Sequence, residues 1–172
     1  MKIKIARLFF LVPLLLALAC SHRDNVSYKD NVKTALEQAD LKDVTVSEDQ
    51  DKNTITLGGT LHSTEAKDKA AEVAKAAANP RIIANEISVQ PVGSESDAKA
   101  VASNLDDAIE KNYKAALISS GLEKQHVSYK AKNGVLTLTG SVHNSTDRQH
   151  AQKIAAGIPN VQQVVNQIEV RR

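Results

Sequence analysis

The stretch Asn133-Gly134-Val135-Leu136-Thr137-Leu138-Thr139-Gly140 decides the fold. After the two turn residues, aliphatic side chains alternate with threonines, which predicts a β-strand with one face buried and the other in water. Asn-Gly between two such runs is the strongest short signal for a hairpin turn. We therefore expect this strand to pair antiparallel with residues 125–130, which precede the turn.

The same pattern occurs a second time in the chain, at a fixed spacing. Residues 32–89 align without a gap with the residues that lie 81 positions further along. The matching pairs include Leu57 with Leu138, Gly59 with Gly140, His62 with His143, and Asn85-Glu86-Ile87-Ser88-Val89 with Asn166-Gln167-Ile168-Glu169-Val170. Such internal similarity indicates one structural unit used twice.

A helix is predicted before each hairpin, because apolar residues recur there at helical spacing. Asp30 is the expected N-cap of the first helix and Ser96-Asp97 of the second, and Gly121 is the expected stop of the second. The second helix is expected to be longer than the first by about two turns. The periodic positions are Val32, Ala35, Leu36 and Ala39 in the first copy, and Val101, Leu105, Ile109, Tyr113 and Leu117 in the second.

Another helix and a last strand follow each hairpin. The helices are predicted over residues 63–78 and 145–156, and the strands over 82–89 and 161–170. A helix between two strands of one sheet makes a right-handed crossover, so the last strand should lie parallel to the middle one. The predicted fold is α+β, with two α-β-β-α-β repeats that each form a three-stranded mixed sheet packed on two helices.

Gly59 and Gly140 lie near the ends of the middle strands, and we interpret both as structural residues. A side chain there would either clash with a crossing helix or be barred by the backbone angle. Each unit has only about 60 residues, a size at which a domain is marginally stable alone, so the two copies are expected to pack together. Val101 and Leu105, on the additional turns of the second copy's first helix, are expected to make this packing.

The N-terminus has the pattern of an export signal. Basic residues precede an apolar run at residues 8–19, which is too short to span a bilayer as a helix. The run ends in Ala17-Leu18-Ala19-Cys20, which resembles the site of lipoprotein signal peptidase and also fits ordinary signal peptidase. Cys20 is the only cysteine in the sequence and is the predicted lipidation site. The alternative is plain secretion with a free thiol.

Each unit resembles a BON domain, the family named for bacterial osmotically inducible and nodulation proteins. The resemblance rests on an aliphatic strand that ends in glycine, a helix of small residues, and a strand with the pattern Asn-x-Ile-x-Val. It implies an α/β sandwich, a place in the periplasm or at the outer membrane, and non-enzymatic roles in envelope integrity and osmotic stress. The predicted organisation is a signal peptide at 1–19, a tether at 20–28, a first domain at 29–90, a linker at 91–97 and a second domain at 98–172.

Composition argues against several functional classes. Residues 1–19 hold three of the 22 basic residues and none of the 20 acidic ones, so the rest of the chain has a net charge near −1. Aromatic residues make up 3% and tryptophan is absent, so no nucleic-acid partner is expected. The five histidines lack cysteines or paired acids to complete a ligand set, and no nucleophile elbow or phosphate-binding glycine loop is present. We therefore predict no cofactor, no metal site and no catalytic residue.

The predicted function is that of a non-enzymatic envelope lipoprotein that binds phospholipid head groups or other envelope proteins. Ser21, which follows the cysteine, favours the periplasmic face of the outer membrane, because an aspartate there typically retains lipoproteins at the inner membrane. Some lipoproteins with two BON domains bind anionic phospholipid through the first helix of the second copy. The helix at this position carries the candidate membrane or partner surface Lys99, Lys111 and Lys114, against Asp97, Asp106, Asp107 and Glu110.

Two other functional hypotheses are open at this stage. One is a soluble periplasmic protein, induced by stress, that binds unfolded clients as a chaperone does; an acylated Cys20 would exclude that version. The other is a hydrolase or metalloenzyme, which requires histidines and acidic side chains that converge in a pocket.

Overall fold

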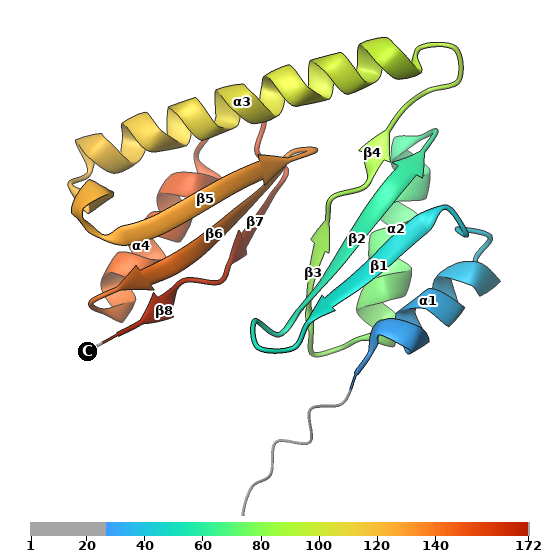
Figure 1. Ribbon diagram of the computed structural model, residues 1–172, viewed down its shortest axis with the longest axis horizontal. Helices are drawn as coiled ribbons and strands as arrows, with labels where there is room; N and C mark the ends of the chain where they lie inside the picture. Colours follow the sequence, from blue (N-terminus) through green and yellow to red (C-terminus); the bar gives the residue numbers. More distant parts are fainter. Residues whose placement is uncertain (1–26, 172) are drawn as a thin grey trace, which may run out of the picture.

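The computed structural model describes residues 27–171, which form two units with the predicted α+β fold (Figure 1). The first unit contains α1 (Lys29–Gln38), β1 (Val44–Asp49), β2 (Thr54–Leu61), α2 (Thr64–Ala77), β3 (Ile82–Asn85) and β4 (Ser88–Val89). The second contains α3 (Glu95–Ser119), the 3-10 helix η1 (Leu122–Lys124), β5 (His126–Lys132), β6 (Val135–Val142), α4 (Ser145–Ala156), β7 (Gln163–Asn166) and β8 (Glu169–Val170). The predicted signal peptide and Cys20 lie outside the described residues.

Each sheet has the predicted mixed topology. β2 pairs antiparallel with β1 and parallel with β3 and β4, and β6 pairs in the same way with β5, β7 and β8. The last strand of each sheet is therefore one strand interrupted in the middle, where Ile87 or Ile168 turns into the core. Asn133 and Gly134 have φ of 48° and 82°, as the predicted two-residue turn requires.

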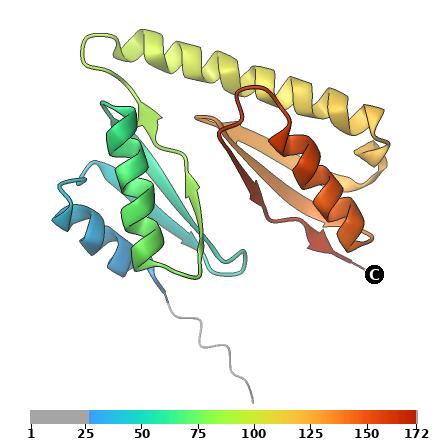
Figure 2. The same cartoon turned by 180° about the vertical axis from the view of Figure 1, so that it is seen from behind.

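Helices cover one face of each sheet and leave the other face uncovered by helices (Figure 2). In the first unit, Val32 and Leu36 of α1, which packs on β1 and α2, share a buried apolar cluster with Ala70 and Ala74 of α2, which packs on β2 and β3. In the second, Ile109, Tyr113 and Leu117 of α3, which packs on β5 and α4, share the equivalent cluster with Ala151 and Ala155 of α4, which packs on β6 and β7. The alanines have no side chain beyond Cβ, which allows α2 and α4 to lie close to their sheets.

The predicted N-caps of the two first helices are wrong. α1 begins at Lys29 with Tyr28 as its N-cap residue, and α3 begins at Glu95. At the start of α1 the backbone N–H groups of Tyr28 and Lys29, which have no partner within the helix, donate to the carboxylate of Glu48 at distances of 3.1 to 3.3 Å. The cap therefore comes from β1, across the fold, and an aspartate next to the helix is not needed for it.

α3 has 25 residues where α1 has 10, so the difference in length between them is larger than the about two turns that the sequence pattern predicted. Its C-terminal part packs on the second sheet, and its N-terminal part extends past that sheet toward the first unit (Figure 1). Gly121 follows the helix with φ of 73°, which confirms it as the helix stop.

Gly59 and Gly140 have φ of 97° and 96°, a conformation that L residues with side chains rarely adopt. A Cβ atom at either position would also collide with a backbone carbonyl oxygen, that of Asp43 at Gly59 and that of His126 at Gly140. The obstacle is therefore the antiparallel neighbour strand, and no crossing helix is involved. Both glycines allow the hairpin strands to remain paired to their ends.

The two copies meet along the edges of their sheets, where β3 and β7 run side by side in opposite directions (Figures 1 and 2). Ala84, Val135 and Val165 form a small buried apolar cluster there. The hairpin turn of each copy contacts the interrupted last strand of the other: Asn133 Nδ2 donates to the Glu86 carbonyl at 2.8 Å, and Lys52 Nζ lies 2.6 Å from Glu169 Oε1.

These contacts relate the copies by an approximate internal two-fold axis. Equivalent positions, 81 residues apart, take part in the contact from both sides: Ala84 and Val165, Thr54 and Val135, Lys52 and Asn133, Glu86 and Gln167. The copies therefore pack as an isologous dimer would, within one chain.

The prediction that Val101 and Leu105 make the packing between the copies is wrong. Their exposed fractions are 57% and 41%. They lie on the part of α3 that extends beyond the second sheet, whereas the buried contact between the copies is made by strand edges.

The side chain of Gln163 closes the edge of β3. Its Nε2 donates to the Ile83 carbonyl, and its Oε1 accepts from the Asn85 N–H at 3.1 Å. These are two of the backbone groups that a further strand would pair with on that edge. One glutamine amide thus takes the place of a strand and blocks the addition of another chain.

We expect Gln163→Leu to loosen this edge, because both backbone groups of β3 lose their partner. The amide hydrogen of Asn85 should exchange about tenfold faster, in line with about 1 to 2 kcal/mol for leaving buried polar groups unpaired. Exchange measured by NMR checks this, with Gln38→Leu on the exposed face of α1 as the control. Equal exchange in both variants would contradict the role of Gln163.

Candidate functional site

The three lysines predicted as a membrane or partner surface all lie on α3 and are exposed. Lys111, Lys114 and Ile118 follow one another at i, i+3 and i+7, so their side chains lie on one face of the helix. We call these three residues the outer face of α3. Lys99 lies three turns earlier, on the part of α3 that extends past the second sheet. Within residues 27–171, none of the three lysines has an ion-pair partner.

Two of the five acidic residues on α3 point away from this face, into the second unit. Asp106 accepts from the backbone N–H groups of Asn133 and Gly134, at 2.7 and 3.0 Å, and so fixes the hairpin turn. Glu110 accepts from the N–H of Ala131 at 2.9 Å and pairs with Lys130 at 2.9 Å. The acidic side chains of α3 thus bind the backbone at the turn end of β5.

Burial alone would raise the pKa of Glu110, but the Ala131 N–H and the Lys130 ammonium outweigh it and lower the pKa below the usual value. The carboxylate therefore stays charged while it is turned inward. Asp97 and Asp107 are the acidic residues that stay exposed between positions 97 and 114. This part of α3 therefore exposes three lysines and two aspartates, whereas the sequence count gave three lysines against four acidic residues.

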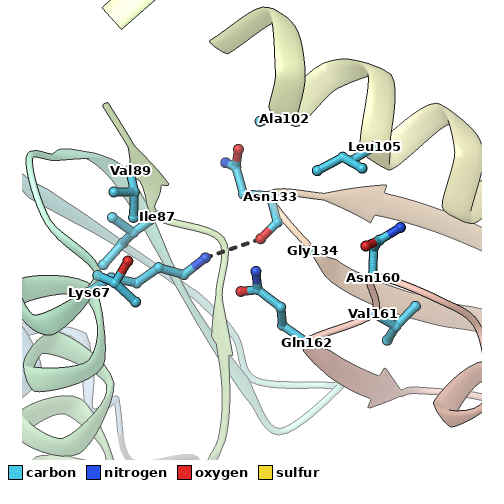
Figure 3. Close-up of a pocket in the computed structure, with 11 residues that line it drawn as sticks. Lys67, Ile87, Val89, Ala102, Leu105, Asn133, Gly134, Asn160, Val161 and Gln162 are labelled. Carbon is cyan, nitrogen blue, oxygen red and sulfur yellow. Dashed lines mark hydrogen bonds between the residues drawn. The ribbon is translucent and has the colours of Figure 1, made fainter. Parts of the chain in front are cut away.

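A cleft of about 450 Å³ lies between the two copies, below the N-terminal half of α3 (Figure 3). One wall comes from α2 and the last strand of the first unit, with Lys67, Ile87 and Val89, and the opposite wall comes from the hairpin turn and the segment before β7. Ala102 and Leu105 of α3 line its top. The ammonium of Lys67 points across the cleft and donates to the Asn133 carbonyl at 3.1 Å.

The histidines within the described part of the chain do not gather into a set of metal ligands. His62 and His143 occupy equivalent places at the ends of β2 and β6, and the ring of His62 lies 2.9 Å from the Gln90 carbonyl. In residues 27–171, no three His, Cys, Asp or Glu side chains come together as metal ligands would. None of the helices in the same residues is long and apolar enough to cross a membrane.

Sequence reasoning missed Lys67 and Gln163, which the structure places at the contact between the copies. Lys67 reads as one more lysine in an ordinary charged helix, and Gln163 as a polar strand residue. The one available signal was the additional length of the second copy's first helix, because a helix longer than its counterpart must extend over something else.

The match to a known family covers both units. The model of the BON domain matches residues 25–91 and again residues 105–172. This chain belongs to the BON domain family. Each BON domain here contains the aliphatic strand that ends in glycine, the helix of small residues and the strand with Asn-x-Ile-x-Val, which are the features that carried the resemblance in the sequence.

One relative and two solved structures resemble this BON domain protein. Osmotically-inducible protein Y of Escherichia coli (strain K12) is 26% identical over 150 residues, which are 86% of this chain and 73% of that protein. The C-terminal domain of CdsD, a structural protein of the type III secretion system of Chlamydia trachomatis, gives a TM-score of 0.35 at 12% identity, over 86% of this chain and 98% of that one. A second structure of CdsD gives 0.36 at 11% identity, over 83% and 91%.

Proposed function

We propose that this chain is a non-enzymatic envelope protein of the osmotic-stress response that binds anionic phospholipid head groups through the outer face of α3. The observation that carries the proposal is the inward position of Asp106 and Glu110, which leaves Lys111 and Lys114 beside an exposed Ile118. Lysines near a membrane attract anionic lipid, and an apolar side chain between them can enter the interface. The similarity to an osmotically inducible protein supports the stress-related part.

In this proposal an acylated Cys20 holds the protein at the periplasmic face of the outer membrane. Only six residues separate Cys20 from Ser27, where the described part of the first domain begins, so both domains stay close to the lipid surface. A weak contact between α3 and head groups then suffices, because the anchor raises the effective concentration of the surface. If Cys20 is not acylated, the protein is a soluble periplasmic one, and α3 is its only proposed membrane contact.

Vesicle flotation of residues 21–172 tests the lipid contact without the acyl chain. We expect flotation with vesicles that contain phosphatidylglycerol, none with phosphatidylcholine alone, and a loss at moderate salt because the attraction is between charges. The double variant Lys111→Glu, Lys114→Glu should weaken the partition at least about tenfold, since each lysine near an anionic surface contributes about 1 kcal/mol.

Lys42→Glu, Lys153→Glu is the matched control, because it makes the same change of charge at exposed lysines outside α3. Equal weakening in both double variants would mean that net charge alone matters. Absence of flotation under every condition would remove the lipid proposal and leave envelope proteins as the partners to seek.

A further inference from the structure

The internal two-fold axis places a second hollow at the positions equivalent to the cleft, and only one of the two is covered by a helix. Residues that line the cleft lie 81 positions from residues that line a second hollow: Lys67 and Arg148, Ile87 and Ile168, Asn133 and Lys52, Gly134 and Asn53. Only the cleft at Lys67 has a helix over it, because the additional turns of α3 have no equivalent in α1. Its volume is about 450 Å³, against about 310 Å³ for the other.

Because of this helix, the basic side chains at the two equivalent positions, Lys67 and Arg148, have different surroundings. Arg148 is exposed, whereas Lys67 has an exposed fraction of 8%. Of the three N–H donors of the Lys67 ammonium, the Asn133 carbonyl accepts one, and no other acceptor is found within residues 27–171. Burial lowers the pKa of Lys67, and the carboxylates of Asp68 and Asp106 offset this only in part. A buried ammonium with unused donors fits an anion in the cleft.

The remaining lining is apolar or neutral. Lys67 is the one charged residue among those that line the cleft, and Ile87, Val89, Leu105 and Val161 supply aliphatic side chains around it. Leu105 remains 41% exposed although it points into the cleft (Figure 3). The volume lies within the range of about 300 to 1,000 Å³ that is usual for small-molecule sites, which also combine apolar walls with few polar groups.

We propose that this cleft binds an aliphatic monoanion, a molecule with a single apolar chain that ends in a carboxylate or a phosphodiester. The head group accepts from the free N–H donors of Lys67, and the chain covers Leu105 and Val161. Two sources supply this chemistry, namely free fatty acids and single-chain phospholipids. The site is separate from the outer face of α3, because Leu105 and Lys111 lie on different faces of the helix.

Calorimetric titration of residues 21–172 with decanoate, decanoyl lysophosphatidylglycerol and uncharged decanol, all below micelle formation, tests the proposal. We expect one saturable site for at least one of the two anions, and the anion that binds identifies the source. Lys67→Met keeps an unbranched side chain, one atom shorter, and removes the charge, so it should weaken binding of the anion about tenfold or more. Its effect on decanol should be small.

Leu105→Ser shortens the apolar wall without touching Lys67, and an exposed position tolerates it. It should weaken the anions and decanol alike. Lys153→Met is the control and should bind as the unaltered chain does. Lys67→Met should still float with anionic vesicles. The anion site in the cleft and the lipid contact through the outer face of α3 can therefore be tested independently. Unchanged affinity in Lys67→Met, or no saturable binding of either anion, would overturn the inference.

Discussion

Replacement of Gly140 by alanine is expected to lower the free energy of unfolding by about 3 kcal/mol or more. The positive φ of 96° is strained for any residue with a side chain, and the new methyl group would meet the His126 carbonyl oxygen on β5. The backbone of a paired strand cannot move aside as a flexible side chain can. Gly59→Ala should act in the same way on the first domain, through the Asp43 carbonyl.

Gly157→Ala is the matched control for this prediction. Gly157 follows α4 with φ of −89°, and its nearest atom to a new Cβ lies 3.5 Å away. Replacement of a glycine in an ordinary conformation by alanine raises the free energy of unfolding by about 0.4 to 1 kcal/mol, because the unfolded chain loses conformational freedom. Urea unfolding followed by circular dichroism measures all three variants. A loss in Gly140→Ala no larger than in Gly157→Ala would contradict the assigned backbone role.

Glu48→Gln is expected to give the second largest loss, about 3 kcal/mol at neutral pH, the lower end of the range for breaking a buried ion pair. Arg81 and Glu48 pair at 3.3 Å with side chains that are 8% and 4% exposed. The guanidinium also lies 5.2 Å from the centre of the Tyr28 ring and donates to Asn53 at 2.8 Å. The neutral amide of the variant can still accept hydrogen bonds, which moderates the loss.

The same carboxyl gives the loss a pH dependence. Burial raises the pKa of Glu48, but hydrogen bonds from Ser27, Tyr28 and Lys29, together with Arg81, outweigh it, and the net result is a pKa below the ordinary value of 4.5. A carboxyl group whose pKa is lower in the folded chain than in the unfolded chain stabilises the fold fully when the pH is above the pKa of the unfolded chain. This contribution is lost as the pH falls through the pKa of the folded chain. The difference between the unaltered chain and Glu48→Gln should therefore shrink below pH 4.5.

Glu37→Gln is the control, because Glu37 pairs with Lys33 at 4.0 Å and both side chains are at least half exposed. Exposed pairs contribute less than about 1 kcal/mol, so this variant should unfold almost as the unaltered chain does at every pH. A Glu48→Gln variant with the same small loss would mean that the pair does not fasten α1 to its sheet.

Local signals in the sequence were enough to predict most of the fold. Asn133-Gly134 and the alternating run after it gave the hairpin, α2 lies within one residue of the predicted bounds at each end, and α4 has the predicted bounds. The N-cap of α1 could not be predicted in this way. Its acceptor, Glu48, comes from a strand rather than from the turn before the helix, and only the fold brings the two together.

The sequence identified the lysines of the candidate site, but it could not predict the net charge that the helix exposes there. Lys99, Lys111 and Lys114 are exposed on α3 as the sequence suggested, but a count of charges along a helix cannot tell which acids turn inward. Asp106 and Glu110 do so because the β5–β6 hairpin presents N–H groups to them. The contact between the copies depends in the same way on tertiary structure, since Gln163 closes an edge that exists only after β3 has formed.

The most direct test of the proposed membrane contact is a fluorescent label at the outer face of α3. Residues 21–172 contain no cysteine, so Ile118→Cys and, as the control on α4, Lys153→Cys can each be labelled at one site with an environment-sensitive dye. With vesicles containing phosphatidylglycerol, we predict a blue shift and higher intensity for the label at 118 and no change for the label at 153. Equal responses at the two positions, or none at 118, would contradict a contact through this face.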